Sequence, residues 1–292
     1  MSLTDLTLLG ARKGLLEKKF SSVELTEECI KNIEKNKKLN AFITETFDLA
    51  RERARLSDQK IANENAGKME GIPFAMKDLF CTKGIKTTSG SKILENFVPP
   101  YESTVSQKLN DEGYVMVGKA NMAEFAADST NKTSYFGSVI NPYKAKDDDR
   151  DLIPGGSSGG SSAALAANMC LASTGSDTGG SIRQPAALCN LVGIKPTYGR
   201  ISRYGMIAYA SSLDQAGFFT KDVRDCAYLT PLVFGKDDKD STSMDKKIPD
   251  LLGNLNSNAK IAVKENYSQN HIFSSLFSTV IKEVHHEATF NS

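Results

Sequence analysis

The chain has 292 residues, of which 40% are hydrophobic and 24% charged, a composition typical of a soluble globular protein with one large or two small domains. Its 36 basic and 35 acidic residues give a net charge of +1, which excludes a global electrostatic attraction to nucleic acid or membranes. No apolar stretch approaches the roughly 20 residues of a membrane span, and the N-terminus has no signal-peptide core, so we expect a cytoplasmic protein without membrane contact.

Residues 1–66 are expected to form an N-terminal helical region. Leucines spaced three residues apart begin this region. Ser21 and Glu24 have the spacing of a capping box at the start of a second helix. Residues 39–44 suit a short strand. A charged helix over 49–65 follows, and we expect its charges to form a solvated face.

Residues 67–292 show strands alternating with helices, which predicts an α/β core. The predicted elements are a strand ending at Lys77, a helix over 102–113, a strand over 114–121 and a short helix over 122–129. A polar loop is expected over 235–258, and a further strand lies within 260–267.

The five cysteines are scattered and odd in number, with neither a metal-ligand spacing nor a CxxC motif. We therefore expect reduced, packed thiols and no metal site in this chain. The paired histidines His285 and His286 could form only a weak metal pair, and a frayed tail explains them better.

A block rich in glycine and serine, Pro154 to Leu188, carries the strongest functional signal. Such runs are often flexible linkers, but here apolar segments with helix-forming residues interrupt the block, which argues against a linker. A phosphate loop would need a lysine after its last glycine, whereas Ser181 follows Gly180. Acyl transfer remains the economical interpretation.

For acyl transfer, Ser181 would be the nucleophile. The backbone N–H groups of Thr178 to Ser181 lie close together without bulky side chains, and such groups can stabilise a developing oxyanion. Ser157 begins a predicted helix earlier in the same block. The helix and strand between the two serines could bring them together, so that Ser157 relays a proton from Ser181 to a base.

We expect a base other than the usual histidine, because all three histidines lie in the last 22 residues, within a polar tail. Lys77 follows a run of apolar residues. Burial there would remove its hydration and favour the neutral amine, which can accept a proton. A surface ion pair is the simpler explanation for a lone lysine, but the two glycine-framed serines favour catalysis.

These residues resemble the amidase signature family, whose pattern matches Gly155–Ala186 from end to end. The resemblance implies that Lys77 is the catalytic lysine, Ser157 the serine of a cis peptide and Ser181 the nucleophile. It also implies a large mixed β-sheet flanked by helices, incomplete at the C-terminus because the chain is shorter than full family members.

The resemblance further assigns supporting roles. The backbone of the following residues corresponds to the oxyanion loop: Thr178, Gly179, Gly180 and Ser181. Ser176 corresponds to a residue that supports the cis serine. Asp128 and Ser129 correspond to a loop beside the substrate, where Asp128 replaces a usual glycine. Asn190 replaces another glycine, and asparagine tolerates the left-handed region.

Within the family, the chain is most similar to the A subunits of aspartyl/glutamyl-tRNA amidotransferases. This implies a glutaminase that supplies ammonia to a B subunit, which uses ATP and magnesium to amidate Glu-tRNA(Gln) or Asp-tRNA(Asn), with a C subunit between them. No cofactor is expected in this chain itself. The segments that carry the similarity are KDLFCTKG (77–84), YESTV (101–105), GKANMAEFA (118–126) and GIKPTYGRISRYGMIAYASSLDQAG (193–217).

Two other functions stay open. A stand-alone amidase would use the same three residues with a different pocket. An inactive fragment would retain them without binding substrate, because the charged residues that hold glutamine in the family lie beyond the matched region.

Overall fold

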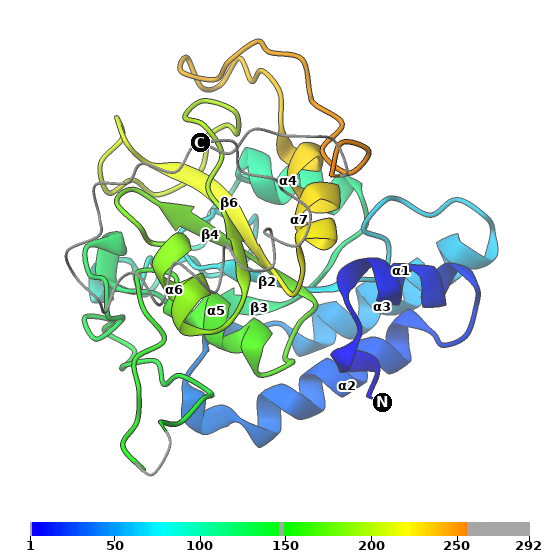
Figure 1. Ribbon diagram of the computed structural model, residues 1–292, viewed down its shortest axis with the longest axis horizontal. Helices are drawn as coiled ribbons and strands as arrows, with labels where there is room; N and C mark the ends of the chain where they lie inside the picture. The colour runs from blue at the N-terminus through cyan, green and yellow to red at the C-terminus, as the bar shows by residue number, and fades with distance from the viewer. Residues whose placement is uncertain (1, 146–148, 256–292) are drawn as a thin grey trace, which may run out of the picture.

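The computed structural model describes residues 2–145 and 149–255, and its core is a six-stranded mixed sheet in the order β1-β3-β2-β4-β6-β5 (Figure 1). The strands are β1 (Phe42–Glu45), β2 (Pro73–Lys77), β3 (Val115–Ala120), β4 (Ala172–Asp177), β5 (Val192–Ile194) and β6 (Gln215–Thr220). Strands β3, β2 and β4 run parallel, whereas β1, β6 and β5 each pair antiparallel with their neighbours.

The helices lie around this sheet (Figure 1). They are α1 (Leu8–Leu16), α2 (Ser22–Lys35), α3 (Phe47–Ala62), α4 (Thr104–Asp111), α5 (Gly159–Ala166), α6 (Arg183–Leu188) and α7 (Val223–Leu229). Helices α2 and α3 contact β3, α5 contacts β2 and β4, and α7 contacts β6. The expected capping box is present, since Ser21 accepts from Glu24 N while the Glu24 side chain accepts from Ser21 N.

The four inner strands are buried along their whole length. Strands covered on both faces form continuous buried runs instead of alternating ones. Proline at the first position of β2 is compatible with a central strand, because a strand's first residue need not donate to the ladder. Because β2 and β4 run parallel, their C-terminal ends, at Lys77 and Asp177, lie at the same edge of the sheet.

Helix α1, near the start of the described residues, is hydrogen-bonded to α7. Asp225 of α7 accepts hydrogen bonds from Leu8 N at 2.7 Å and Leu9 N at 2.9 Å. Because the first N–H groups of a helix have no partner within the helix, this carboxylate satisfies two of them. Lys221 also donates to Leu6 O at 3.2 Å.

The predicted α/β fold with a large mixed sheet is confirmed, and β2 ends at Lys77 as expected. The prediction of a helix over 122–129 is largely wrong. Only a 3-10 turn forms at Glu124–Ala126, because Phe125 and Ala126 adopt positive φ values of 47° and 61°. A left-handed backbone cannot continue a right-handed helix.

Several other expectations from the sequence can be compared with the structure. Asn190 has a φ of 53°, so asparagine occupies the left-handed position predicted for it. The strand expected near 39–44 forms as β1 and pairs with β3, while the division near residue 66 stays a prediction. The strand expected within 260–267 and the three histidines lie outside the described residues.

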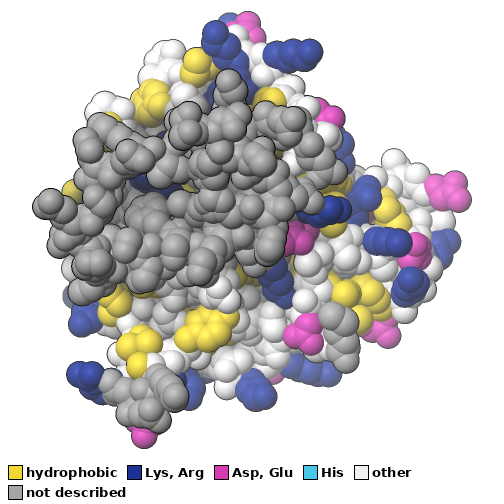
Figure 2. Space-filling view, in the orientation of Figure 1, with side chains coloured by type: hydrophobic (Ala, Val, Ile, Leu, Met, Phe, Trp, Pro, Cys, Tyr) yellow, Lys and Arg dark blue, Asp and Glu magenta, His cyan; other side chains and the backbone are white. Residues whose placement is uncertain are grey.

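All five cysteines are free and buried, as expected for packed thiols. No helix among the described residues is both long and apolar enough to cross a membrane. On the face in Figure 2, acidic and basic side chains are interspersed over the parts that are not drawn in grey, without a continuous basic stripe there.

Candidate active site

Lys77, at the end of β2, is fully buried and bound by three hydroxyl groups. Its Nζ donates to Ser157 Oγ at 2.7 Å and to Ser158 and Ser176 Oγ at 2.8 Å each. The three acceptors match the three N–H groups of an ammonium. A neutral amine has two N–H groups and a lone pair, so one hydroxyl must then rotate and donate to the lysine. The site can therefore accommodate both protonation states.

The electrostatics of Lys77 favour the neutral amine. Burial lowers the pKa of Lys77 from 10.5 to about 7, because the low-dielectric interior disfavours the ammonium. The carboxylates of Asp177 and Asp214 act in the opposite direction and raise this pKa. The balance leaves a lysine that can gain or lose a proton near neutral pH, as general-base chemistry requires.

Ser157 follows a cis peptide bond between Gly156 and Ser157. Gly156 is packed so closely that a Cβ there would lie 2.6 Å from Asp128 O and 2.8 Å from the Ser129 carbonyl carbon. Only glycine fits, and the loop carrying Asp128 therefore lies directly against the turn that presents Ser157. Asn131 reinforces this contact by accepting from Gly159 N at 3.0 Å.

A cavity of about 800 Å³ lies beside this turn. Ser157 itself is fully buried, while its neighbour Gly156 lines the cavity wall. The candidate oxyanion and substrate-loop residues also line this wall, namely Thr178, Gly179, Gly180, Ser181, Asp128 and Ser129. The structure therefore gathers all of these residues around one space large enough for a small substrate.

Ser181 is partly exposed at the cavity wall, just before α6. Among the described residues, its hydroxyl makes no hydrogen bond to Ser157. Two groups of predicted residues are thus assembled, a buried Lys77–Ser157 network and a cavity lined by Ser181, with Gly156 adjoining both.

The turn between β4 and α6 is held by Asp177. Its Oδ2 accepts from Ile182 N at 3.1 Å, and Arg183 donates to both carboxylate oxygens at 2.9 and 3.1 Å. Burial raises the pKa of Asp177, but these hydrogen bonds outweigh burial and hold the pKa below its usual value. An ionised carboxylate therefore fixes the backbone on either side of Ser181.

Asp128 lines the cavity, but its carboxylate is used within its own turn. It accepts from Thr130 N and Oγ1 at 2.9 Å and from Lys132 N at 2.8 Å. Burial raises the pKa of Asp128, and these hydrogen bonds lower it to a net value below the usual one. The carboxylate of Asp128 therefore mainly stabilises its own turn, the candidate substrate loop.

Two features of the network were not predicted from the sequence. Ser158 binds Lys77 as closely as Ser157 does, and Ser176 contacts Lys77 without a hydrogen bond to Ser157 among the described residues. The run of adjacent serines was visible in the sequence, but which hydroxyl would face the lysine depends on the cis turn.

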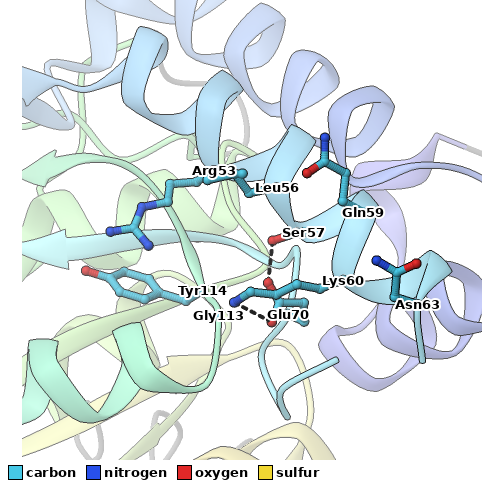
Figure 3. A pocket seen from close by; sticks show the side chains of 9 residues that line it. All are labelled: Arg53, Leu56, Ser57, Gln59, Lys60, Asn63, Glu70, Gly113 and Tyr114. Atoms are coloured by element: carbon cyan, nitrogen blue, oxygen red, sulfur yellow. Dashed lines mark hydrogen bonds and ion pairs between the residues drawn. The ribbon is translucent and has the colours of Figure 1, made fainter. Parts of the chain in front are cut away.

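A smaller hollow of about 290 Å³ lies beside α3 and shares no lining residue with the cavity (Figure 3). Ser57 and Lys60 point toward the buried Glu70, at 2.7 and 3.3 Å from its carboxylate oxygens (Figure 3). Because these contacts are internal to the fold, this hollow adds nothing to the chemistry around Lys77.

The chain is similar to several known proteins. A family model described as Amidase matches residues 24–286. The A subunit of the glutamyl-tRNA(Gln) amidotransferase of Paramagnetospirillum magneticum is 57% identical over 250 residues, which cover 85% of this chain and 51% of that protein. The chain therefore spans about half the length of the curated relatives it matches.

Solved structures show the same relationship. The A subunit of the glutamyl-tRNA(Gln) amidotransferase from Thermotoga maritima superposes with a TM-score of 0.69 and 41% identity, covering 85% of this chain and 50% of that one. An amidase family protein from Bacillus anthracis gives a TM-score of 0.84 with 26% identity, covering 99% of this chain and 60% of that one.

Proposed function

This chain belongs to the amidase family, and from that premise we propose that it hydrolyses glutamine as the A subunit of a tRNA-dependent amidotransferase. The observation that carries the proposal is the buried lysine bound by Ser157 next to a cavity lined by Ser181. A lysine with a pKa of about 7 can act as the base, and the described residues contain no histidine that could take this role.

In the acylation step, neutral Lys77 takes the proton of Ser157 while Ser157 takes that of Ser181. Ser181 Oγ then attacks the side-chain amide carbon of glutamine and forms a tetrahedral intermediate. The backbone N–H groups of Thr178 to Ser181 are the proposed partners of its oxyanion. When the C–N bond breaks, the proton on Lys77 returns through Ser157 to the departing nitrogen, which leaves as ammonia.

Deacylation reverses the proton path. Water replaces ammonia and attacks the acyl-Ser181 ester, while Lys77 again accepts a proton through Ser157. Collapse of the second intermediate releases glutamate and returns the proton to Ser181. One lysine therefore acts as base and then as acid in each half of the cycle.

The proposed biological setting is a cytoplasmic heterotrimer. The released ammonia would pass to a B subunit, which holds ATP and magnesium and amidates Glu-tRNA(Gln) or Asp-tRNA(Asn), with a C subunit completing the complex. The near-neutral charge of this chain suits a subunit that leaves most tRNA contacts to its partners. Co-purification of tagged B and C subunits tests this assignment.

The enzymatic proposal is tested by intact-mass spectrometry after exposure to an electrophilic glutamine analogue. We expect one covalent adduct on the wild-type chain and none on Ser181→Ala, whose circular dichroism should stay unchanged. Lys77→Met should be nearly as damaging, because the nucleophile then keeps its proton. An adduct of equal yield on Ser181→Ala would refute the assignment of the nucleophile.

A second candidate is a stand-alone amidase that acts on another amide. The charged residues of the cavity lining, Asp128 and Arg183, are both engaged within the fold, so neither is free to bind the charged groups of glutamine. A fluorophosphonate probe, which reacts with activated serines generally, separates the two. Labelling by this probe but not by the glutamine analogue would favour the second candidate, whereas labelling by neither would favour an inactive fragment.

A further inference from the structure

We propose that Asp214 is a positioning residue for acyl transfer, which holds the loop after β4 and the turn that carries Tyr209 in one arrangement around the cavity and contributes to the electric field at Lys77. The inference rests on the proposed role of Lys77 as the base. Asp214 does not line the cavity itself, and its effect is exerted through Thr178, Tyr209 and Lys77.

The sheet register brings Asp214 to this position. Strands β4 and β6 pair antiparallel with Asp177 opposite Gln215. The residue after β4, Thr178, therefore lies opposite the residue before β6, Asp214. Their contact is fixed by the ladder of two fully buried strands and not by the long connection between them.

Asp214 is 3% exposed, and its carboxylate joins two segments that line the cavity. Its Oδ1 accepts from Thr178 Oγ1 at 2.5 Å, which anchors the start of the candidate oxyanion loop. Its Oδ2 accepts from Tyr209 N at 2.9 Å and Ala210 N at 3.1 Å. Because Thr178 and Tyr209 both line the cavity, displacement of this single carboxylate would shift both walls.

Asp214 also acts on Lys77 through its charge. The carboxylates that raise the pKa of Lys77 are Asp177 and Asp214, and they oppose the effect of burial. Asp177 is paired with Arg183, whereas Asp214 is bound by one hydroxyl and two backbone N–H groups. Removing the charge of Asp214 should therefore lower the pKa of Lys77.

Other charged groups near Asp214 line a separate hollow that shares no lining residue with the cavity. A small hollow of about 210 Å³ is lined by Asp214 together with Arg203, Lys239 and Asp240. Arg203 pairs with Asp240 at 3.5 Å. These groups are intact in each variant used below except where Asp240 is itself replaced.

Asp240 provides a control, because it is a buried aspartate that, like Asp214, accepts from one hydroxyl and two backbone N–H groups, although it is also paired with Arg203. It accepts from Thr242 Oγ1 at 2.7 Å, Arg203 N at 2.8 Å and Thr242 N at 3.0 Å. Unlike Asp214, it forms no hydrogen bond to a described residue of the cavity and does not contribute to the shift at Lys77. Asp240→Asn thus reports the general cost of altering a buried aspartate in this region.

The experiment has two readouts on the whole chain. The protonation of Lys77 is followed by NMR of ¹³Cε-lysine, with the Lys77 signal identified by its loss in Lys77→Met. Labelling of Ser181 by a fluorophosphonate is followed by mass spectrometry at high pH, where Lys77 is neutral in every variant. Asp214→Asn should move the Lys77 midpoint to lower pH and slow labelling at least about tenfold. Asp240→Asn should do neither.

Thr178→Val separates the two effects, because it removes the anchor of the loop but keeps the charge of Asp214. It should slow labelling and leave the Lys77 midpoint unchanged. If Asp214→Asn does not fold, Asp214→Glu keeps the charge and displaces the carboxylate, so it should behave like Thr178→Val.

An unmoved midpoint together with unchanged labelling in folded Asp214→Asn would overturn the inference. Absence of labelling in the wild-type chain would instead contradict the proposed acyl transfer. In that case the role of Asp214 is still decided by two measurements on Asp214→Asn. The Lys77 midpoint from NMR should move to lower pH, and amide hydrogen exchange at Tyr209 and Ala210 should be faster than in the wild type. An unmoved midpoint with unchanged exchange in Asp214→Asn would then refute it.

Discussion

Lys77 combines full burial with three hydroxyl partners, and in the proposed mechanism its protonation controls the reactivity of Ser181. With a pKa of about 7, only about a tenth of the molecules hold the neutral amine at pH 6. We therefore expect the rate of Ser181 labelling to rise about tenfold between pH 6 and pH 8 and then level off. A flat profile over this range, measured by mass spectrometry, would exclude Lys77 as the base.

The same residue should affect stability in a pH-dependent way. The folded state lowers the pKa of Lys77 well below its value in the unfolded chain, so between about pH 7 and pH 10 the unfolded state binds more protons. The free energy of unfolding contributed by Lys77 should thus rise with pH across this window. Relative to Lys77→Met, the wild type should gain several kcal/mol, as measured by urea unfolding. A constant difference between the two proteins would contradict the lowered pKa.

At the scale of single residues, the local sequence patterns point to Lys77, Ser157 and Ser181, and the structure places them in and beside the same site. Lys77 follows an apolar run, and Ser157 and Ser181 are framed by glycines. Ser158 and Asp214 were missed for a physical reason. Their roles depend on the turn at Ser157 and on the register of two strands that are distant in the sequence.

Among the elements, β6 connects the outer strand β5 to the rest of the sheet. Gly217, in the middle of β6, approaches its neighbour so closely that a Cβ would lie 2.0 Å from Ile194 O. We expect Gly217→Ala to lower the free energy of unfolding by about 1 to 3 kcal/mol, because the obstructing atom belongs to the backbone and cannot rotate away.

Gly179→Ala is the matched control for stability, since a Cβ at Gly179 meets no atom within 4 Å. Urea unfolding of both variants checks the expectation. Equal stability of Gly217→Ala and the wild type would mean that β5 is not held against β6 as the structure has it.

Elements were predicted well where periodicity and burial agree, as for β2 and β3. The segment after β3 was predicted as a helix because its composition favours helix, but close packing of Gly90 against Met122 O and the left-handed backbone at Phe125 prevent one. Such tertiary contacts override local propensity. Strand order and register likewise could not be predicted from one sequence.

For the molecule as a whole, the contact between Asp225 and α1 joins the first and last α-helices of the described residues. Burial raises the pKa of Asp225 to about 6, and hydrogen bonds from Leu9 N and Leu8 N only partly oppose this. Between about pH 4 and pH 6 the unfolded chain has lost this proton while the folded chain retains it. The contribution of Asp225 to the free energy of unfolding should therefore fall as pH rises through this window.

Asp225→Asn cannot titrate, so its stability relative to the wild type should increase by about 2 to 3 kcal/mol from pH 4 to pH 6. A constant offset for the altered hydrogen bonds is expected in addition. Urea unfolding at several pH values measures the difference, with the exposed Asp238→Asn as a control that should show no such trend.

The capping of α1 by Asp225 also has a consequence for biosynthesis. The carboxylate that receives the first N–H of this helix lies 217 residues further along the chain. A ribosome therefore releases α1 long before Asp225 is made, and the helix lacks this cap while the intervening residues are synthesised. Nascent chains stalled before Asp225 should therefore expose α1 to proteases more than the finished chain does.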